Sequence, residues 1–210
     1  MAAKAKTKSR AQSRPARSRQ TRSTGSRRTT SRPRARGHAA LATVARQMTE
    51  EMESRSMPTD AIAMLEQDHR EVESFLEQFE EAEENAEKAE LARKICVALT
   101  VHAELEESMF YPEAREWLAE ESEEDEELID EAEVEHMSAK QLIAEIEKMT
   151  PREKLFDAKV KVLGEYVKHH VKEEEQEMFP KLRKTDMDLE DLAEKMSEKK
   201  LKLFQKMGRK

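Results

Sequence analysis

The sequence contains few of the residues on which small β-rich or disulfide-bonded folds depend. It has one cysteine, four glycines, one tryptophan and two tyrosines among 210 residues, and 40% of all residues are charged. The lone Cys96 cannot form an internal disulfide, which fits a reducing cytosol, and we expect a cytoplasmic protein. Because sandwiches and barrels need turn glycines and β-branched runs, this composition predicts long, solvated helices instead.

Long apolar runs are missing as well, and acidic residues are missing from one end. No run reaches the roughly 18 apolar residues of a membrane span, and no apolar stretch marks a secretory signal, so we expect no membrane segment. Residues 1–49 contain 14 basic residues and no Asp or Glu, whereas residues 50–210 carry 24 basic and all 46 acidic residues. The net charge of −8 therefore divides into +14 and −22.

The basic N-terminal segment has almost no apolar side chains that could form a hydrophobic core. Thirteen of residues 1–37 are Arg or Lys, and the first leucine of the chain is Leu41. We predict a disordered basic arm and linker over residues 1–57. We expect disorder in residues 1–37 because little apolar area offsets the backbone entropy lost on ordering, whereas the mildly amphipathic residues 39–57 should form a short linking helix or none. Such an arm neutralises phosphates without reading bases, which favours a non-specific tether to nucleic acid. Alternatives are an organelle transit peptide, which needs an apolar face, and an arm that folds back on the acidic body.

A pattern of two helices occurs twice in the rest of the chain. In the first helix, inward positions follow one another at steps of three and four, with a histidine third, and the pattern recurs 67 residues later. The second helix carries a histidine and, four residues on, a glutamate, and recurs after 68 residues. The first-helix positions are Ile62, Leu65, His69, Val72, Leu76 and Phe79, repeated as Ile129, Ala132, His136, Ala139, Ile143 and Ile146. The second-helix positions are Ala92, Ile95, Leu99, His102 and Glu106, repeated as Val160, Leu163, Val167, His170 and Glu174.

Four helices with short connections form an antiparallel, up-down bundle whose halves are related by a pseudo-twofold axis. We therefore predict an all-α fold with a four-helix bundle over residues 58–183 and an extra amphipathic helix within residues 184–210. Residues 150–153, Thr-Pro-Arg-Glu, combine an N-cap, a first-turn proline and an acid at the third position. This predicts that the fourth helix of the bundle begins at Pro151.

The histidines and glutamates at the inward positions are the residues that could bind a metal ion. Residues i and i+4 stack on one helix face, so His102 with Glu106, and His170 with Glu174, can each direct a nitrogen and an oxygen at a common point. Buried carboxylates are costly unless a cation compensates them, and a metal ion does so directly. With one histidine from each first helix, the candidate metal ligands are His69, His102, Glu106, His136, His170 and Glu174.

The competing interpretation is a bundle held by His–Glu hydrogen bonds with no ion. A single inward histidine is more often a core residue than a ligand. The recurrence of the whole set at equivalent positions favours metal binding, with one or two ions. These ligands suit zinc and manganese as well as iron.

Four segments resemble the hemerythrin-like HHE cation-binding domains. They are residues 65–70 (LEQDHR), 102–112 (HAELEESMFYP), 134–136 (VEH) and 169–180 (HHVKEEEQEMFP). The resemblance covers about residues 60–183. It implies a hemerythrin-like bundle with a non-haem, usually di-iron, centre able to bind dioxygen or related small ligands. It also implies ligand roles for the six residues above, with both glutamates bridging the ions.

The sequence departs from the oxygen-carrying hemerythrins in two places. Those proteins have a fifth histidine four residues after the one on the third helix, where this chain has Lys140. The missing ligand implies a more symmetric centre. They also place the fourth-helix carboxylate five residues after its histidine, so Glu175 is an alternative to Glu174, although the repeat with Glu106 favours Glu174.

We therefore expect a metal-ion protein, with two iron ions, that binds or senses dioxygen, nitric oxide or peroxide, or buffers iron. One alternative is a peroxide-decomposing di-iron enzyme, in which Tyr166, one turn before His170, or a bridging glutamate moves protons. The other is a metal-free helical interaction protein. The sequence specifies no oligomeric state.

Overall fold

The computed structural model describes residues 33–54, 58–121 and 123–209, and most of the predicted basic arm, residues 1–32, lies outside them. All regular elements in the described residues are helical, with no strand among them, which confirms the predicted all-α fold. The helices are α1 (Pro33–Ser54), α2 (Ala61–Glu81), α3 (Asn85–Leu105), α4 (Tyr111–Glu121), α5 (Glu123–Ile146), α6 (Phe156–Glu173), α7 (Phe179–Leu182) and α8 (Leu189–Gly208). Two π-helical turns, η1 (Glu106–Phe110) and η2 (Glu174–Met178), continue α3 and α6.

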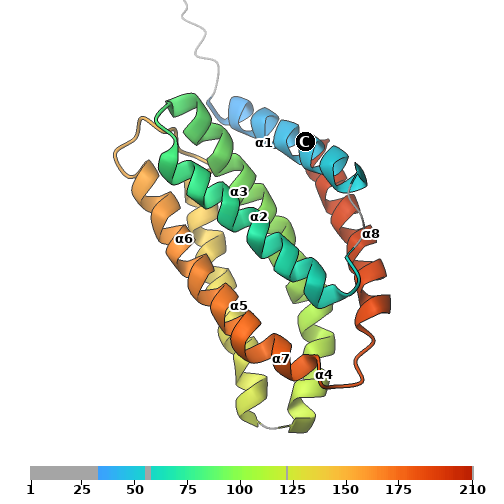
Figure 1. The fold of residues 1–210 in the computed structure, drawn as a ribbon. Coiled ribbons are helices and arrows are strands. Elements are labelled where there is room, and N and C mark those ends of the chain that lie inside the picture. Colours follow the sequence, from blue (N-terminus) through green and yellow to red (C-terminus); the bar gives the residue numbers. More distant parts are fainter. Residues whose placement is uncertain (1–32, 55–57, 122, 210) are drawn as a thin grey trace, which may run out of the picture. The chain divides into compact units, whose positions relative to one another are not determined.

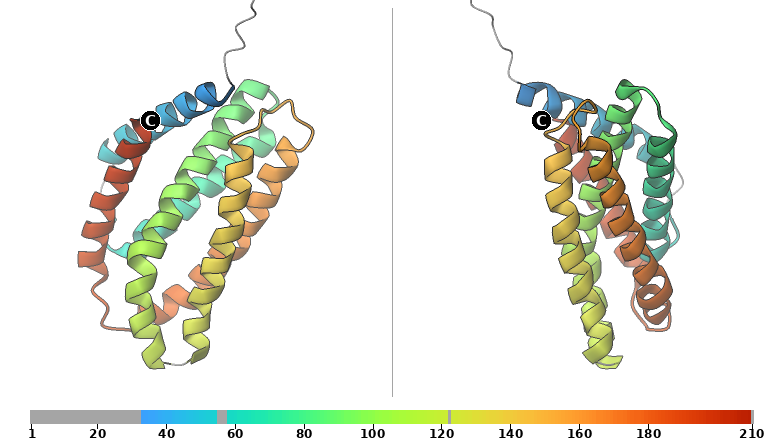
Figure 2. Two further views of the ribbon diagram at one scale, coloured as in Figure 1. Left: turned by 180° about the vertical axis from the view of Figure 1, so that it is seen from behind. Right: turned by 90° about the vertical axis from the view of Figure 1, so that its left-hand side faces the viewer.

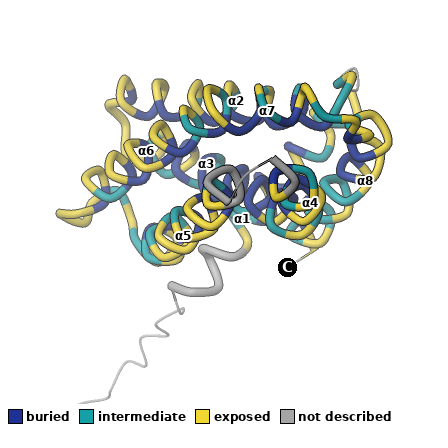
Figure 3. Tube along the Cα trace, turned by 90° about the horizontal axis from the view of Figure 1, so that it is seen from below, coloured by how far each residue is buried: buried dark blue, intermediate teal, exposed yellow. Residues whose placement is uncertain are grey.

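The bundle consists of α2, α3, α5 and α6 (Figure 1). Helix α2 packs against α3 and α6, and α5 packs against the same two helices, so each of the four has two neighbours. Through η1, α3 continues into α4, which runs beside α5. Inward faces are buried and outward faces exposed along these helices (Figure 3). The repeated apolar positions Ile62, Leu65, Ile95, Ile129 and Leu163 are fully buried.

The starts of α2 and α6 differ in how well the sequence locates them. Asp60 caps α2, because its side chain accepts a hydrogen bond of 2.8 Å from the backbone N–H of Ala63. Helix α6 begins at Phe156, so the predicted start at Pro151 is wrong. The cap contact does form, since the backbone N–H of Thr150 donates to Glu153 Oε1 at 2.8 Å. It closes a turn ahead of the helix, however, and not the helix itself.

Helices α1 and α8 lie side by side against one flank of the bundle (Figures 1 and 2). Helix α1, with buried Ala45 and Met48, begins at Pro33 and so includes most of the predicted linker, for which a short helix was one of the two expected forms. Arg46 Nη1 donates to the carbonyl of Gly208 at 2.9 Å. A Cβ at Gly208 would lie 2.8 Å from Arg46 Cγ, so a glycine permits this close approach.

None of the described helices combines the length and apolarity that a membrane crossing requires.

Candidate metal centre

The two helices that carry both a candidate histidine and a glutamate widen at the glutamate. Helix α3 becomes π-helical at Glu106, and α6 does so at Glu174. The backbone N–H of Tyr111 donates to the carbonyl of Glu106, and that of Phe179 to Glu174, each five residues back. A proline, which lacks an N–H, directly follows each of these donors. Single π-turns are rare and frequently occur at functional sites.

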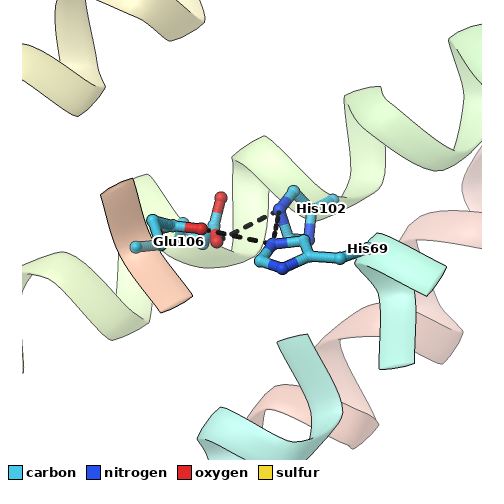
Figure 4. A group of neighbouring side chains, drawn as sticks. His69, His102 and Glu106 are labelled. Carbon is cyan, nitrogen blue, oxygen red and sulfur yellow. Dashed lines mark hydrogen bonds and ion pairs between the residues drawn. The ribbon is translucent and has the colours of Figure 1, made fainter. Parts of the chain in front are cut away.

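The first cluster joins one face of α2 to the end of α3 (Figure 4). His69 Nε2 lies 3.2 Å from His102 Nε2, and His102 Nε2 lies 3.1 Å from Glu106 Oε1. Glu174 Oε2 reaches in from the fourth helix and lies 3.2 Å from His69 Nε2. All four side chains are buried.

The second cluster repeats this arrangement in the other half of the bundle. His136 Nε2 lies 3.2 Å from His170 Nε2. Glu106 Oε2 lies 3.3 Å from His136 Nε2, and Glu174 Oε2 lies 3.5 Å from His170 Nε2. The structure therefore brings all six predicted residues together at one point between four helices.

Glu106 is the centre of both clusters, with one oxygen directed to each. Its side chain is fully buried, and no hydrogen bond from the described residues reaches Oε1 or Oε2, although imidazole nitrogens lie close. Glu174 Oε2 is likewise without a hydrogen bond. Buried carboxylate oxygens without donors are strongly destabilising, so the site fits a cation that would accept their electron pairs.

Protons compensate these carboxylates when no ion is bound. Burial alone lowers the pKa of His102, but the negative charges of Glu106 and Asp68 outweigh it and raise the pKa to about 10. His170 follows the same pattern: burial lowers its pKa, while Glu174 and Glu135 raise it to about 9. Burial raises the pKa of Glu106, yet His102 and His136 bring it well below the usual value.

Carboxylates on the outer side hold the imidazoles in place. His69 Nδ1 lies 2.9 Å from Glu175 Oε1, and His136 Nδ1 lies 3.0 Å from Glu107 Oε1. Because such a carboxylate accepts from Nδ1, it fixes the tautomer that turns Nε2 inward, as is usual for metal-binding histidines. The sequence analysis did not identify Glu107 as an outer partner, although it and Glu175 follow the two inward glutamates directly and recur with the repeat.

The other two imidazoles have outer partners that are less alike. His170 Nδ1 lies 2.9 Å from Glu135 Oε2, whereas His102 Nδ1 lies 3.7 Å from Asp68 Oδ2. Asp68 and Glu135 occupy the same place in the repeat, one residue before a candidate histidine. The shorter aspartate leaves a wider gap, and both facing atoms, His102 Nδ1 and Asp68 Oδ2, lack a hydrogen bond.

The structure also gives positions to the two alternative glutamates, Glu174 and Glu175, and to Lys140 and His169. Glu174 faces the imidazoles, while Glu175 lies outside them and pairs with Arg70 Nη2 at 2.6 Å. Lys140 does not enter the centre but pairs with Glu107. The side chain of His169 is 60% exposed, points away from the centre and lies 3.2 Å from Glu173 Oε1.

A pocket adjoins the four imidazoles on the side away from η1 and η2. Val72, Leu99 and Ile143 are among the apolar residues of its wall. Tyr166 also lines it, but 47% of this residue is exposed. Tyr111 has a direct contact with a candidate ligand instead: it is buried, and its hydroxyl donates to Glu174 Oε1 at 2.9 Å. The sequence motif contained Tyr111, but only the π-turn brings it to the inner face.

Comparisons with known proteins agree with this geometry. A protein of Nostoc sp. (strain PCC 7120 / SAG 25.82 / UTEX 2576) named DNA nickase is 27% identical over 147 residues. The match covers 69% of this chain, which spans only 40% of the length of that relative. No solved structure matches the chain.

The family model described as the hemerythrin HHE cation binding domain matches residues 60–182, which include all six inward histidines and glutamates. The chain therefore belongs to the hemerythrin HHE cation-binding domain family.

Proposed function

We propose that the six inward residues hold a pair of iron ions and that the centre binds or senses a small ligand. His69 and His102 would hold one ion, and His136 and His170 the other. Glu106 would bridge them, because its two oxygens point at the two histidine pairs. Iron would supply an open coordination position and reversible electron transfer, while zinc and manganese fit the same donors.

The observation that carries this proposal is the state of Glu106. A fully buried carboxylate with no hydrogen bond from the described residues, placed among imidazole Nε2 atoms, needs positive charge beside it, and a metal ion held by those same nitrogens supplies that charge directly. Outer carboxylates that turn those nitrogens inward support the same conclusion.

The pocket beside the imidazoles supports a small ligand. Its walls are largely apolar, and an uncharged diatomic molecule enters such a space at little desolvation cost. Dioxygen and nitric oxide fit this description. Iron buffering would use the same ligands and leave the pocket without a purpose, so we favour ligand binding.

Metal content and the visible spectrum, before and after exposure to oxygen, test this function. We expect close to two ions per chain after purification with iron present, and a spectrum that changes with oxygen. His102→Ala should lose most of the metal, whereas His169→Ala, a control with an exposed imidazole, should keep it. Less than about half an ion per chain would refute the proposal, because a preformed site of six ligands retains its metal.

A steady turnover of hydrogen peroxide by the iron-loaded chain, lost in His102→Ala, would favour the peroxide-decomposing enzyme instead.

A second candidate function concerns nucleic acid. Eleven of residues 1–32 are basic and none is acidic, and the relative from Nostoc is named a DNA nickase. We propose that this segment tethers the acidic body to nucleic acid through phosphate contacts alone.

Binding to a DNA duplex by fluorescence anisotropy at two salt concentrations tests the tether. We expect affinity to fall steeply between about 50 and 200 mM salt, with little preference for sequence. Deletion of residues 1–32, which leaves α1 complete, should abolish binding. A chain whose Arg and Lys in that segment are replaced by Gln controls for length, and retained binding by either variant would exclude the tether.

A further inference from the structure

The two halves of the centre differ at one pair of equivalent aromatic residues. Tyr111 follows η1 and Phe179 follows η2, at the same place in the repeat. The ring of Tyr111 stacks on His136, with centroids 5.6 Å apart, and that of Phe179 stacks on His69, with centroids 6.0 Å apart. Both residues are 1% exposed. The two rings therefore have matching places, and the hydroxyl of Tyr111 is what distinguishes them.

The Tyr111 hydroxyl forms a hydrogen bond with one of the two inward glutamates and not with the other. It donates to Glu174 Oε1 at 2.9 Å, which leaves Glu174 with one oxygen, Oε2, directed at the imidazoles. Glu106 faces no such donor, and both of its oxygens remain available. The pseudo-twofold relation of the ligands is thus broken by a residue that is not itself one of them.

The broken relation makes the two metal positions unequal in ligands, in contrast to the more symmetric centre that the sequence implied. His69, His102, Glu106 and Glu174 offer four atoms that all lie within 4.8 Å of one another. The other position has three such donors, from Glu106, His136 and His170. Glu174 Oε2 is also nearer to His69 Nε2, at 3.2 Å, than to His170 Nε2, at 3.5 Å.

We propose that Tyr111 sets this inequality: by holding Glu174 Oε1, it assigns Glu174 to the His69–His102 position and leaves the His136–His170 position one ligand short. The first position then binds metal more tightly, and the second provides the place where a small ligand coordinates. This inference rests on the proposed function.

A role in packing alone makes a different prediction. A buried phenol needs a hydrogen-bond partner wherever it lies, and Glu174 Oε1 would serve. In that case, removal of the hydroxyl would change the stability of the fold but would leave the difference between the two metal positions as it was. Tyr111→Phe separates these roles, because it keeps the ring that stacks on His136.

The experiment is a titration of the metal-free full chain with zinc, in competition with a chromophoric chelator. Zinc serves as the probe because it is redox-inert. We expect two binding steps of one ion each, with affinities separated by about tenfold or more. In Tyr111→Phe, Glu174 Oε1 is released toward the second position, so the weaker step should tighten by about tenfold, similar in size to the affinity lost when an outer partner of a metal ligand is removed. The two steps should then converge.

The double variant Tyr111→Phe/Phe179→Tyr moves the hydroxyl to the other half. The new hydroxyl should form a hydrogen bond with an oxygen of Glu106 and so make it unavailable to one metal position. The affinities of the two zinc-binding steps should then differ again. Thermal unfolding of each metal-free variant shows whether it is folded, and if the double variant is not, the single variant decides the matter alone.

Two results would overturn the inference and leave the metal centre intact. One is a Tyr111→Phe chain whose two affinities remain as far apart as in the parent chain, and the other is a parent chain whose two steps are equal. A parent chain that binds less than about half an equivalent of zinc would overturn the proposed centre itself.

Discussion

Lys200 in α8 forms an ion pair with Asp68 in α2, the residue directly before His69. Both side chains are largely buried, at 13% and 9% exposure. Burial raises the pKa of Asp68, but the charges of Lys200 and His102 outweigh it, and the net pKa is lowered. Since α8 lies beyond the matched domain, residues 60–182, a helix outside that domain contributes to the environment of a candidate ligand.

Lys200→Met should destabilise the metal-free chain. It leaves Asp68 buried without its cation, which we expect to cost about 2 to 3 kcal/mol, somewhat less than for a fully buried pair. A carboxylate whose folded pKa is lowered contributes its full stability above its unfolded pKa. The loss should therefore be largest near neutral pH, begin to shrink at the unfolded value, about 4, and disappear as the pH falls through the lower folded value. Urea unfolding at pH 7 and pH 4 measures both.

Lys202→Met provides the matched control, because Lys202 is 72% exposed and pairs only one turn away, with Glu198. It should change the free energy of unfolding by less than about 0.5 kcal/mol. Equal changes in the free energy of unfolding for the two lysine variants would show that the Lys200–Asp68 pair stabilises the fold no more than the exposed Lys202–Glu198 pair does.

Substitution of the two adjacent acids on η2 should distinguish the inward one from the outward one. Glu174→Gln removes an oxygen that faces His69 Nε2, and we expect the zinc-binding capacity itself to fall. Glu175→Gln weakens the acceptor on His69 Nδ1 and the ion pair with Arg70 but removes no inward oxygen, so both ions should still bind, with about tenfold lower affinity for at least one.

Glu177→Gln is the control for both, since Glu177 is an exposed residue of the same π-turn. The assignment of Glu174 fails if Glu175→Gln lowers the number of bound ions while Glu174→Gln does not. Equilibrium dialysis against zinc gives the number of ions directly.

The sequence predicts the bundle and the six inward residues because both follow from helical spacing. His102 and Glu106 lie four apart on one face, and the same pair recurs at His170 and Glu174, so the period alone places them together. The orientation of Tyr111 has another origin. It depends on the extra residue of η1, and the pattern of apolar positions does not register a π-turn. Tyr166 was singled out by an unbroken α-helical count from His170 and proves half exposed.

Local signals failed where a contact distant in sequence decides the structure. The cap formed by Thr150 and Glu153 is present, but it stabilises a turn, and the helix begins five residues later than Pro151. Residues 33–54 carry little apolar area of their own, and their helix is packed against α8, whose position the sequence of α1 cannot specify.

The thiol of Cys96 should be inert in the folded chain. Its side chain is 1% exposed, and burial, with a smaller effect from Glu147, raises its pKa far above the ordinary thiol value. Because the thiolate is the reactive form, an aromatic disulfide reagent at pH 8 should label less than about a tenth of the chains within minutes. Labelling should become complete in denaturing urea. Fast labelling of the native chain would mean that α3 opens locally.

Metal affinity should rise with pH, because zinc must displace protons from imidazoles whose pKa values are raised. Glu106 and Asp68 outweigh burial to raise the pKa of His102 to about 10, and Glu174 and Glu135 outweigh burial to raise that of His170 to about 9. Below these values each ligand loses one proton on binding. We therefore expect up to about a tenfold gain in apparent affinity per pH unit for each proton released, between about pH 6 and 8.

Calorimetric titration with zinc in two buffers of different ionisation enthalpy counts these protons. Two released per chain at pH 7 would match the two raised imidazoles, one at each metal position, and the apparent affinity of each step should then increase by about tenfold per pH unit. Glu135→Gln removes a carboxylate that raises the pKa of His170 without offering an inward oxygen, so it should reduce the number of protons released while the number of ions stays the same. An affinity that is flat from pH 6 to 8 would show that the imidazoles are already deprotonated in the metal-free chain, and that the carboxylates are compensated by some other means.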